Sequence, residues 1–155
     1  MNLVPTDDGG YMGTGQVITT TYRALQIERF DSVGDTLWTK KYFIPGYAFY
    51  NGAGMGLIKT QDQNYAQSGT LINASTNNGN GILIKFNQNG DTLWMRQYDG
   101  GGYWNDLDQV LQLADGSYIL AGATNKYSAG NNIDAYLIKT DSNGNLLWEK
   151  HYGGG

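Results

Sequence analysis

Short apolar runs bounded by turn-forming pairs recur along the whole chain. In residues 81–98, GILIKFNQNGDTLWMRQY, two runs rich in Ile, Leu and Trp lie on either side of Asn89-Gly90. Such runs predict β-strands, and Asn-Gly between them predicts a tight hairpin turn. No segment carries the i, i+3, i+4, i+7 stripe of apolar residues that marks an amphipathic helix, so no helix is predicted.

This hairpin pattern appears three times in the chain. The related stretches are residues 24–42, ALQIERFDSVGDTLWTKKY, and residues 134–152, DAYLIKTDSNGNLLWEKHY. Their tryptophans, Trp38, Trp94 and Trp148, are 56 and 54 residues apart. A second series keeps the same interval: Tyr11, Tyr65 and Tyr118, each followed four residues later by a glycine. A fixed period near fifty residues predicts tandem units of a solenoid or a propeller.

Each unit is predicted to be a meander of four short antiparallel strands. We therefore expect an all-β fold of three β-propeller blades in a single segment, 1–155, with blades at about 1–50, 51–103 and 104–155. The alternative, a β-sandwich, gives no reason for turns to repeat in phase. In the first unit, residues 43–54, FIPGYAFYNGAG, are expected to form a long aromatic exit loop.

Three blades are fewer than the four to eight that usually close a propeller ring. The repeat begins and stops near blade boundaries, so an arc of three would leave two apolar blade faces in water. We therefore expect either the remaining blades of a larger parent protein or a second copy of the chain as partner. Two copies would supply six blades.

Composition narrows the function classes. The formal net charge is −4, which argues against nucleic acid as a partner. Cysteine is absent, which excludes disulfides and a thiol nucleophile. The first residues, MNLVPTDDGG, have no signal-peptide pattern, and no apolar run is long enough to predict a membrane span. Asn, Gly, Thr, Gln and Tyr dominate the predicted surface, as in many secreted β-proteins.

Aromatic residues gather in the loops at one end of the predicted blades. This end combines the loops between second and third strands, 19–23, 75–80 and 125–133, with the blade-to-blade loops, 43–54 and 99–105. The candidate binding residues there are Tyr22, Arg23, Tyr47, Phe49, Tyr50, Tyr103, Trp104 and Tyr127. Aromatic-rich loops on a rigid scaffold favour a binding site. Packing between blades is the alternative: it is open for Tyr47 and Trp104 and favoured for the others.

The third unit resembles a family of tandem propeller repeats found in secreted and cell-surface bacterial proteins, many with type IX secretion sorting tails. The resemblance rests on DGSYILAG at 115–122 and DAYLIKTD at 134–141, followed by Gly144, Trp148 and Tyr152-Gly-Gly. It covers the whole chain, closely in the third unit and loosely in the first. It implies an extracellular bacterial propeller and carries over no catalytic residues. The sorting tail is not among these residues.

Residues with catalytic or metal-binding chemistry are few. His151 is the only histidine and has no Cys or His partner for zinc. The segment 141–145, DSNGN, has oxygen ligands at alternate positions, but it lacks the bidentate Glu of a calcium loop and stands where a turn is needed. Neither a metal nor a cofactor is expected. Paired acids for glycoside hydrolysis would have to come from Asp106, Asp108 and Asp62.

The sequence thus favours a non-enzymatic propeller module, secreted or on a bacterial cell surface, with a structural role or a protein or glycan ligand. The alternatives are a polysaccharide hydrolase or lyase with its acids at the mouth of the channel, and a passive spacer domain. No catalytic residue is assigned.

Overall fold

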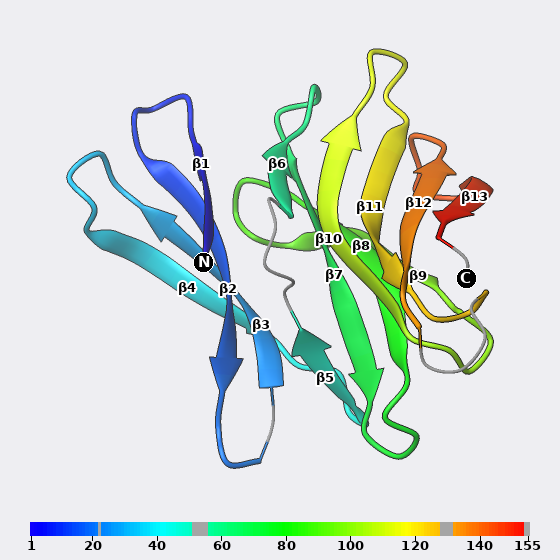
Figure 1. Cartoon of the computed structure of the whole chain (residues 1–155). Coiled ribbons are helices and arrows are strands. Elements are labelled where there is room, and N and C mark those ends of the chain that lie inside the picture. Colours follow the sequence, from blue (N-terminus) through cyan, green and yellow to red (C-terminus); the bar gives the residue numbers. More distant parts are fainter. Residues whose placement is uncertain (22, 51–55, 128–131, 154–155) are drawn as a thin grey trace.

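The computed structural model describes residues 1–21, 23–50, 56–127 and 132–153, and within them all regular structure is β-strand. The strands form three antiparallel sheets in chain order (Figure 1). The first contains β1 (Asn2–Pro5), β2 (Tyr11–Ile18), β3 (Arg23–Phe30) and β4 (Thr36–Tyr42). The second contains β5 (Tyr47–Tyr50), β6 (Leu57–Lys59), β7 (Tyr65–Asn73), β8 (Gly79–Phe86) and β9 (Thr92–Tyr98). The third contains β10 (Asn105–Gln112), β11 (Tyr118–Thr124), β12 (Asp134–Thr140) and β13 (Leu146–Tyr152).

The predicted all-β fold of blade-like meanders is confirmed. Consecutive strands pair within each sheet, except that β5 and β6 both pair with β7, and the register repeats from one sheet to the next. Tyr11 is opposite Phe30 in the first sheet, and Tyr65 is opposite Phe86 in the second. Among the described residues no helix is long and apolar enough to cross a membrane.

The hairpin between the third and fourth strands is the most regular element of the repeat. In the first sheet the amide of Asp31 donates to the carbonyl of Asp35 at 2.9 Å, and Gly34 donates to Asp31 at 3.3 Å. Gly34 has φ of 92°. This is a three-residue turn with one left-handed glycine. The equivalent Asn89 does not take positive φ, so the two-residue Asn-Gly turn expected from sequence is replaced by this longer loop.

A bulge follows each of these turns. The pairing skips Leu37, so that Trp38 is opposite Arg29 while Thr36 is opposite Phe30. The same shift occurs at the equivalent positions in the other two sheets, Leu93 and Leu147. Because a bulge turns the strand locally, it directs the following side chain to a different face. The repeated tryptophan is therefore placed identically in each sheet.

The sequence predicts a long loop at 43–54, but residues 47–50 of this segment form a strand, and residues 51–54 lie outside the described residues. Tyr47–Tyr50 form β5, which pairs with the C-terminal half of β7 from Thr70 to Asn73, whereas β6 pairs with the N-terminal part of β7. Together the two short strands occupy the position that β10 fills alone in the third sheet, where a bulge lies at the equivalent point. The second sheet therefore begins at Tyr47, slightly earlier than the boundary expected near position 51.

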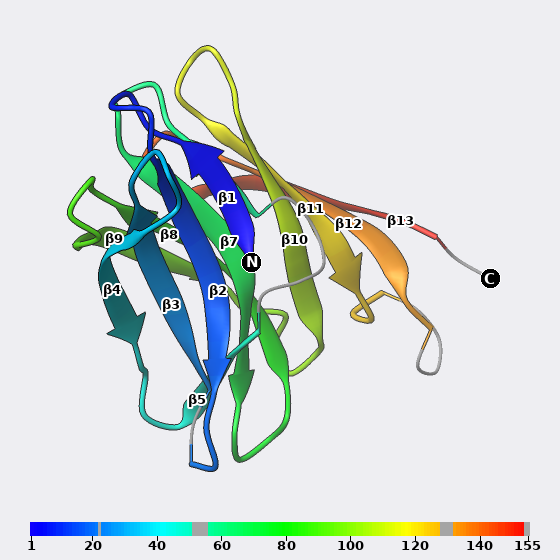
Figure 2. The same cartoon turned by 90° about the vertical axis from the view of Figure 1, so that its left-hand side faces the viewer.

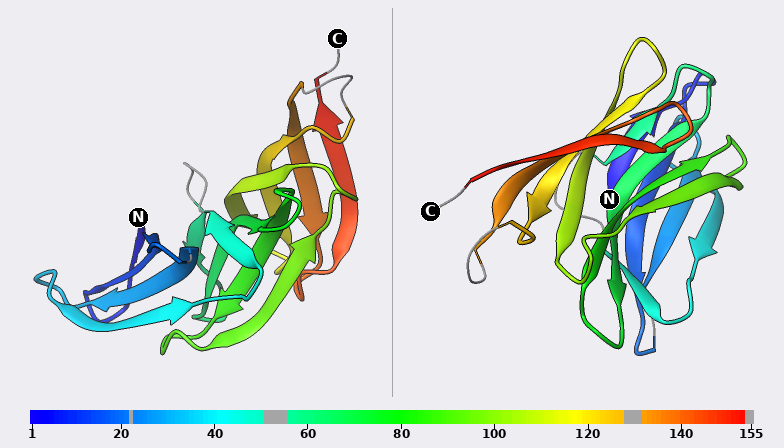
Figure 3. Two further views of the ribbon diagram at one scale, coloured as in Figure 1. Left: turned by 90° about the horizontal axis from the view of Figure 1, so that it is seen from below. Right: turned by 90° about the vertical axis from the view of Figure 1, so that its right-hand side faces the viewer.

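The three sheets lie side by side, with the second between the other two (Figures 2 and 3). Two apolar cores fill the spaces between them. The first includes Met12 and Ile27 of the first sheet and Ile84 of the second. The other core includes Leu83 of the second sheet and Leu120 of the third. Because side chains alternate along β8, the middle sheet contributes to both cores and is covered on both faces.

Candidate functional site

An open groove of about 330 Å³ lies at the loop end predicted from sequence. Three segments from two sheets form it: the connection between β2 and β3, the link from β4 to β5, and the residue after β7. Its lining comprises Thr19, Thr20, Thr21, Arg23, Phe43, Gly46, Tyr47, Ala48 and Ala74. The groove therefore spans the junction between the first two sheets.

Local hydrogen bonds fix the link that forms one wall of the groove. The amide of Tyr47 donates to the carbonyl of Ile44 at 3.1 Å, which closes a turn. Ala74 donates to Gly46 at 2.9 Å and so ties the link to the end of β7. Gly46 has φ of 80°, a conformation that glycine adopts without strain. Tyr47 packs partly on the first core while its remaining surface lines the groove.

The groove offers polar and aromatic contacts together. Arg23 is exposed at the start of β3, and its side chain makes no hydrogen bond or ion pair to another described residue. The three consecutive threonines add hydroxyl groups that both donate and accept hydrogen bonds. Phe43 and Tyr47 supply aromatic surface. Such a combination suits a polar ligand with apolar faces, because a few directed polar groups orient it against an apolar wall.

The other predicted residues lie elsewhere. Phe49 is only 1% exposed and belongs to the first core, so it packs between sheets. Tyr50 and Tyr103 are exposed but do not line the groove. Trp104 is half-buried and packs on Gly79, where an added Cβ would lie 3.0 Å from the indole. Tyr127 stacks on His151 with ring centroids 4.0 Å apart. Tyr22 lies outside the described residues.

The structure thus brings together Arg23 and Tyr47 of the predicted set and adds residues that the sequence did not single out. Phe43 was missed because it directly follows a strand, where a pattern does not show which way the chain turns. The threonines at 19–21 lie in a loop that the sequence predicts, but they were not among the candidate binding residues because those were chosen mainly for aromatic side chains. A run of three hydroxyl residues beside Arg23 was the available signal.

The acids considered for hydrolysis do not form one cluster. Asp62 lies in the hairpin before β7 and pairs with Lys85 at 2.6 Å. Asp106 accepts a hydrogen bond from Thr70, farther along β7. The strand from Tyr65 to Thr70 alone spans about 17 Å at ~3.3 Å per residue. Paired carboxylates of glycoside hydrolases are about 5–10 Å apart, so Asp62 is too far from Asp106 to act with it.

Asp108, next to Asp106 on β10, is in a different environment. Burial, together with the nearby charge of Asp106, raises the pKa of the Asp108 carboxyl. Its Oδ1 is buried and has no hydrogen-bond partner among the described residues. A carboxyl in such surroundings holds its proton more readily than an exposed one.

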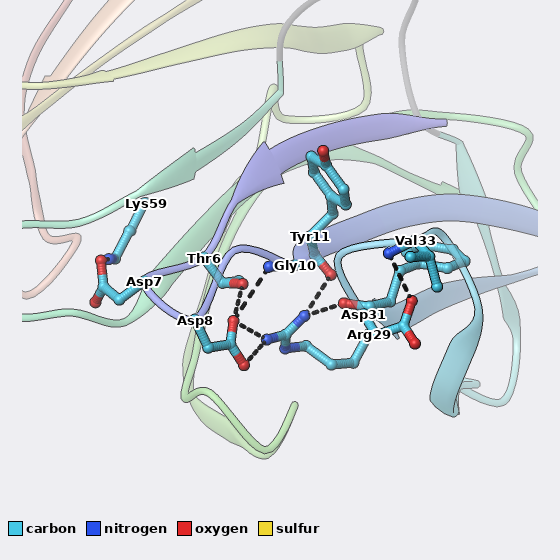
Figure 4. A network of polar contacts seen from close by, with 10 residues as sticks. Thr6, Asp7, Asp8, Gly10, Tyr11, Arg29, Asp31, Val33 and Lys59 are labelled. Atoms are coloured by element: carbon cyan, nitrogen blue, oxygen red, sulfur yellow. Dashed lines mark hydrogen bonds and ion pairs between the residues drawn. The ribbon is translucent and has the colours of Figure 1, made fainter.

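At the opposite end of the sheets, ion pairs hold the hairpins that precede β2 and β7. One terminal nitrogen of Arg29 donates to both carboxylate oxygens of Asp8 at 2.5 Å, and the other donates to the carbonyl of Tyr11 at 3.1 Å (Figure 4). The Thr6 hydroxyl donates to Asp8 at 2.6 Å. Hydrogen bonds from Thr6 and Gly10, with Arg29 nearby, lower the pKa of Asp8 to about 2. The pair between Lys85 and Asp62 repeats this arrangement, so we assign these charges to hairpin structure.

The segment 141–145, which has a calcium-like pattern, behaves as a turn. One carboxylate oxygen of Asp141 accepts from the amides of Asn143 at 2.9 Å and Asn145 at 2.8 Å, and the other accepts from the Asn145 side chain. These bonds, with Asn145 contributing most, lower the pKa of Asp141. Within the described ranges, no group of three or more His, Cys, Asp or Glu side chains is arranged to hold a metal ion.

Fold and site together define a class: an all-β chain of three antiparallel, propeller-blade-like sheets with a groove at one end. The sequence matches no model of a known protein family, and a search of curated proteins finds no relative.

Proposed function

We propose that this chain is a non-enzymatic propeller module that binds a glycan or protein ligand in the groove between its first two sheets. The observation that carries the proposal is the convergence of Arg23, Tyr47 and the threonines at 19–21 on one groove. The repeats resemble those of secreted and cell-surface bacterial propellers, and this resemblance supports a location outside the cell, with export by a type IX route.

The chemistry of the groove favours a carbohydrate, and acidic sugars most of all. A sugar presents hydroxyls for the threonines and apolar ring faces for Phe43 and Tyr47, and a carboxylate would pair with Arg23. The walls come from backbone segments held by the hydrogen bonds of Gly46 and Tyr47. A groove that is already formed spends little free energy on ordering when a ligand binds.

The test is binding of the full chain to an array of neutral and acidic glycans, followed by titration of the best ligand. Arg23→Ala removes the charge without opening a core and should weaken binding about tenfold or more, a loss of about 1.4 kcal/mol. Tyr47→Ala should weaken it as well. Tyr103→Ala, an exposed aromatic at the same end, is the matched control and should bind normally. Circular dichroism reports whether each variant is folded.

Two other outcomes would redirect the proposal. If no glycan or extracellular protein binds, or if Arg23→Ala and Tyr47→Ala bind normally, the groove is not the site and a passive spacer role is favoured. The raised pKa of Asp108, beside Asp106, is the one feature that favours the hydrolase or lyase alternative. Polysaccharide turnover that is lost in Asp106→Asn, with folding intact, would establish that alternative instead.

A further inference from the structure

Each junction between neighbouring sheets uses the same contact. Trp38 and Lys40 of β4 lie over Gly90 in the turn of the second sheet, where an added Cβ would meet the indole at 2.7 Å and the lysine stem at 3.2 Å. At the next junction Trp94 of β9 lies over Gly144, with 2.8 Å to the indole. Both glycines are buried. A turn glycine is therefore required at each junction, because any side chain there would collide with the preceding tryptophan.

Polar contacts repeat at the same two junctions. The Tyr42 hydroxyl donates to the carbonyl of Gly90, and the Tyr98 hydroxyl donates to the carbonyl of Gly144 at 2.9 Å. At the first junction Lys40 also forms an ion pair with Asp91, the residue after the turn glycine. One face of each sheet thus presents a Trp, a cation and a Tyr to the turn of the next sheet.

The same three groups are presented by β13, which has no neighbouring sheet on this side among the described residues. Trp148 is exposed with Lys150 5.6 Å from its ring centroid, close to the 5.8 Å between Lys40 and Trp38. Tyr152 is 54% exposed, whereas its equivalent Tyr98 is 6% exposed. Trp148, Lys150 and Tyr152 are therefore arranged like the Trp, cation and Tyr at the internal junctions, but they are exposed to solvent.

The complementary turn is open at the other end of the stack (Figure 1). Gly34 is exposed, and no described atom lies within 4 Å of the place where its Cβ would be. The Asp35 side chain has no partner among the described residues. Leu3 and Tyr11 beside them are 55% and 40% exposed, although their equivalents Leu57 and Tyr65 are 4% and 1% exposed. Leu3, Tyr11 and Gly34 line an almost wholly apolar hollow of about 390 Å³.

We propose that a second copy of this chain covers these faces, with β13 of each copy docked head to tail on the first sheet of the other. Trp148 then lies over Gly34 of the second copy, the Tyr152 hydroxyl donates to the Gly34 carbonyl, and Lys150 pairs with Asp35. The two faces match by the same contacts that join the sheets within one chain, including the opposite charges. Of the multiples of three, only six lies within the four to eight blades that usually close a ring, so the product is a closed dimer.

Native mass of the full chain, measured over a dilution series, tests the proposal. The expected result is a species of twice 17.0 kDa that dissociates on dilution. Trp148→Ala should weaken the dimer at least tenfold. Leu147→Ala, an exposed neighbour at the bulge, is the matched control and should leave it unchanged. Circular dichroism and thermal unfolding of the diluted monomers show whether both variants are folded.

A charge swap distinguishes head-to-tail closure from any other dimer. Lys150→Glu alone and Asp35→Lys alone each place like charges at both junctions, so each variant should dimerise more weakly than the wild type. Mixed in equal amounts they restore opposite charges at both junctions, and the mixed dimer should recover. A monomer at every concentration, or a dimer insensitive to Trp148→Ala and not rescued by mixing, overturns the proposal. Glycan binding is measured separately, so this proposal and the groove can fail independently.

Discussion

Glu149 on β13 accepts hydrogen bonds from one side chain on the neighbouring strand β12 and from two in the loop after β11. The Lys126 ammonium donates to Oε1 at 2.9 Å, and the buried Tyr136 donates to Oε2 at 2.5 Å. The Tyr127 hydroxyl also donates to Oε1. Burial by itself raises the pKa of this carboxyl, but the bonds from Tyr127, Tyr136 and Lys126 outweigh it and lower the pKa to about 2. These contacts fasten the loop after β11 to the outer strand of the third sheet.

This shift makes stability depend on pH. Because the folded pKa is below the unfolded value, the carboxylate stabilises the fold above about pH 4.5 by roughly 3 kcal/mol, and that contribution is lost as the pH falls toward 2. We expect Glu149→Gln to lower the free energy of unfolding near pH 7, with the gap to wild type narrowing in acid. Urea titrations between pH 7 and pH 2 measure it. Tyr127→Phe should give a smaller effect, and parallel curves for Glu149→Gln and wild type would contradict the assignment.

At the scale of the element, the hairpin before β7 adopts its turn with an unfavourable residue. Gln63 has φ of 61°, where the equivalent positions in the other sheets are Gly9 and Gly116 with φ of 83° and 82°. The turn still closes, because the amide of Thr60 donates to Asn64 at 2.8 Å. The sequence of the turn itself, QDQN, is a poor turn signal. The pairing of the flanking strands β6 and β7 therefore determines that the hairpin forms.

Gln63→Gly should stabilise the protein by about 0.5–1 kcal/mol, since glycine adopts this conformation without the steric cost that a side chain incurs. The Gln63 side chain is exposed and makes no hydrogen bond to another described residue, and glycine keeps the backbone carbonyl that accepts from the Gln88 side chain. Chemical denaturation measures the change. The reverse substitution, Gly116→Gln in the third sheet, should cost about 1 kcal/mol. A destabilised Gln63→Gly together with a neutral Gly116→Gln would show that this conformation is not under strain.

Strand β5 shows where reasoning from an element's own sequence fails. Tyr47–Tyr50, YAFY, is aromatic and contains no turn residue, yet it follows Pro45-Gly46 and precedes Asn51-Gly52, so it resembles a loop. It becomes a strand because the backbone groups of β5 can pair with the edge of β7 along its C-terminal half. The same pairing buries Phe49 and carries Tyr47 to the groove.

At the scale of the whole molecule, the middle sheet is the most protected part. Every residue from Gly81 to Phe86 of β8 is buried, because both faces have a neighbouring sheet. In dilute solution we expect the amides of β8 to exchange with deuterium more slowly than those of β3 and β12, the equivalent strands of the outer sheets. Hydrogen-exchange mass spectrometry measures this. Equal protection of the three strands in the monomer would contradict the idea that contact between sheets stabilises the fold.

The sequence by itself determined the repeat, the meander and the tight turns, because strand alternation and turn chemistry are local properties that depend on neighbours along the chain. It also placed the loops that form the groove at one end. Only the tertiary structure decided which loop residues meet there: Arg23 and Phe43 lie at the adjacent ends of the paired strands β3 and β4, and the pairing of β5 with β7 adds Tyr47 to the same groove. Neighbouring sheets likewise decide which tryptophans are covered. Trp94 packs against the third sheet, whereas the equivalent Trp148 is exposed, with no neighbouring sheet over it in the described part of the chain.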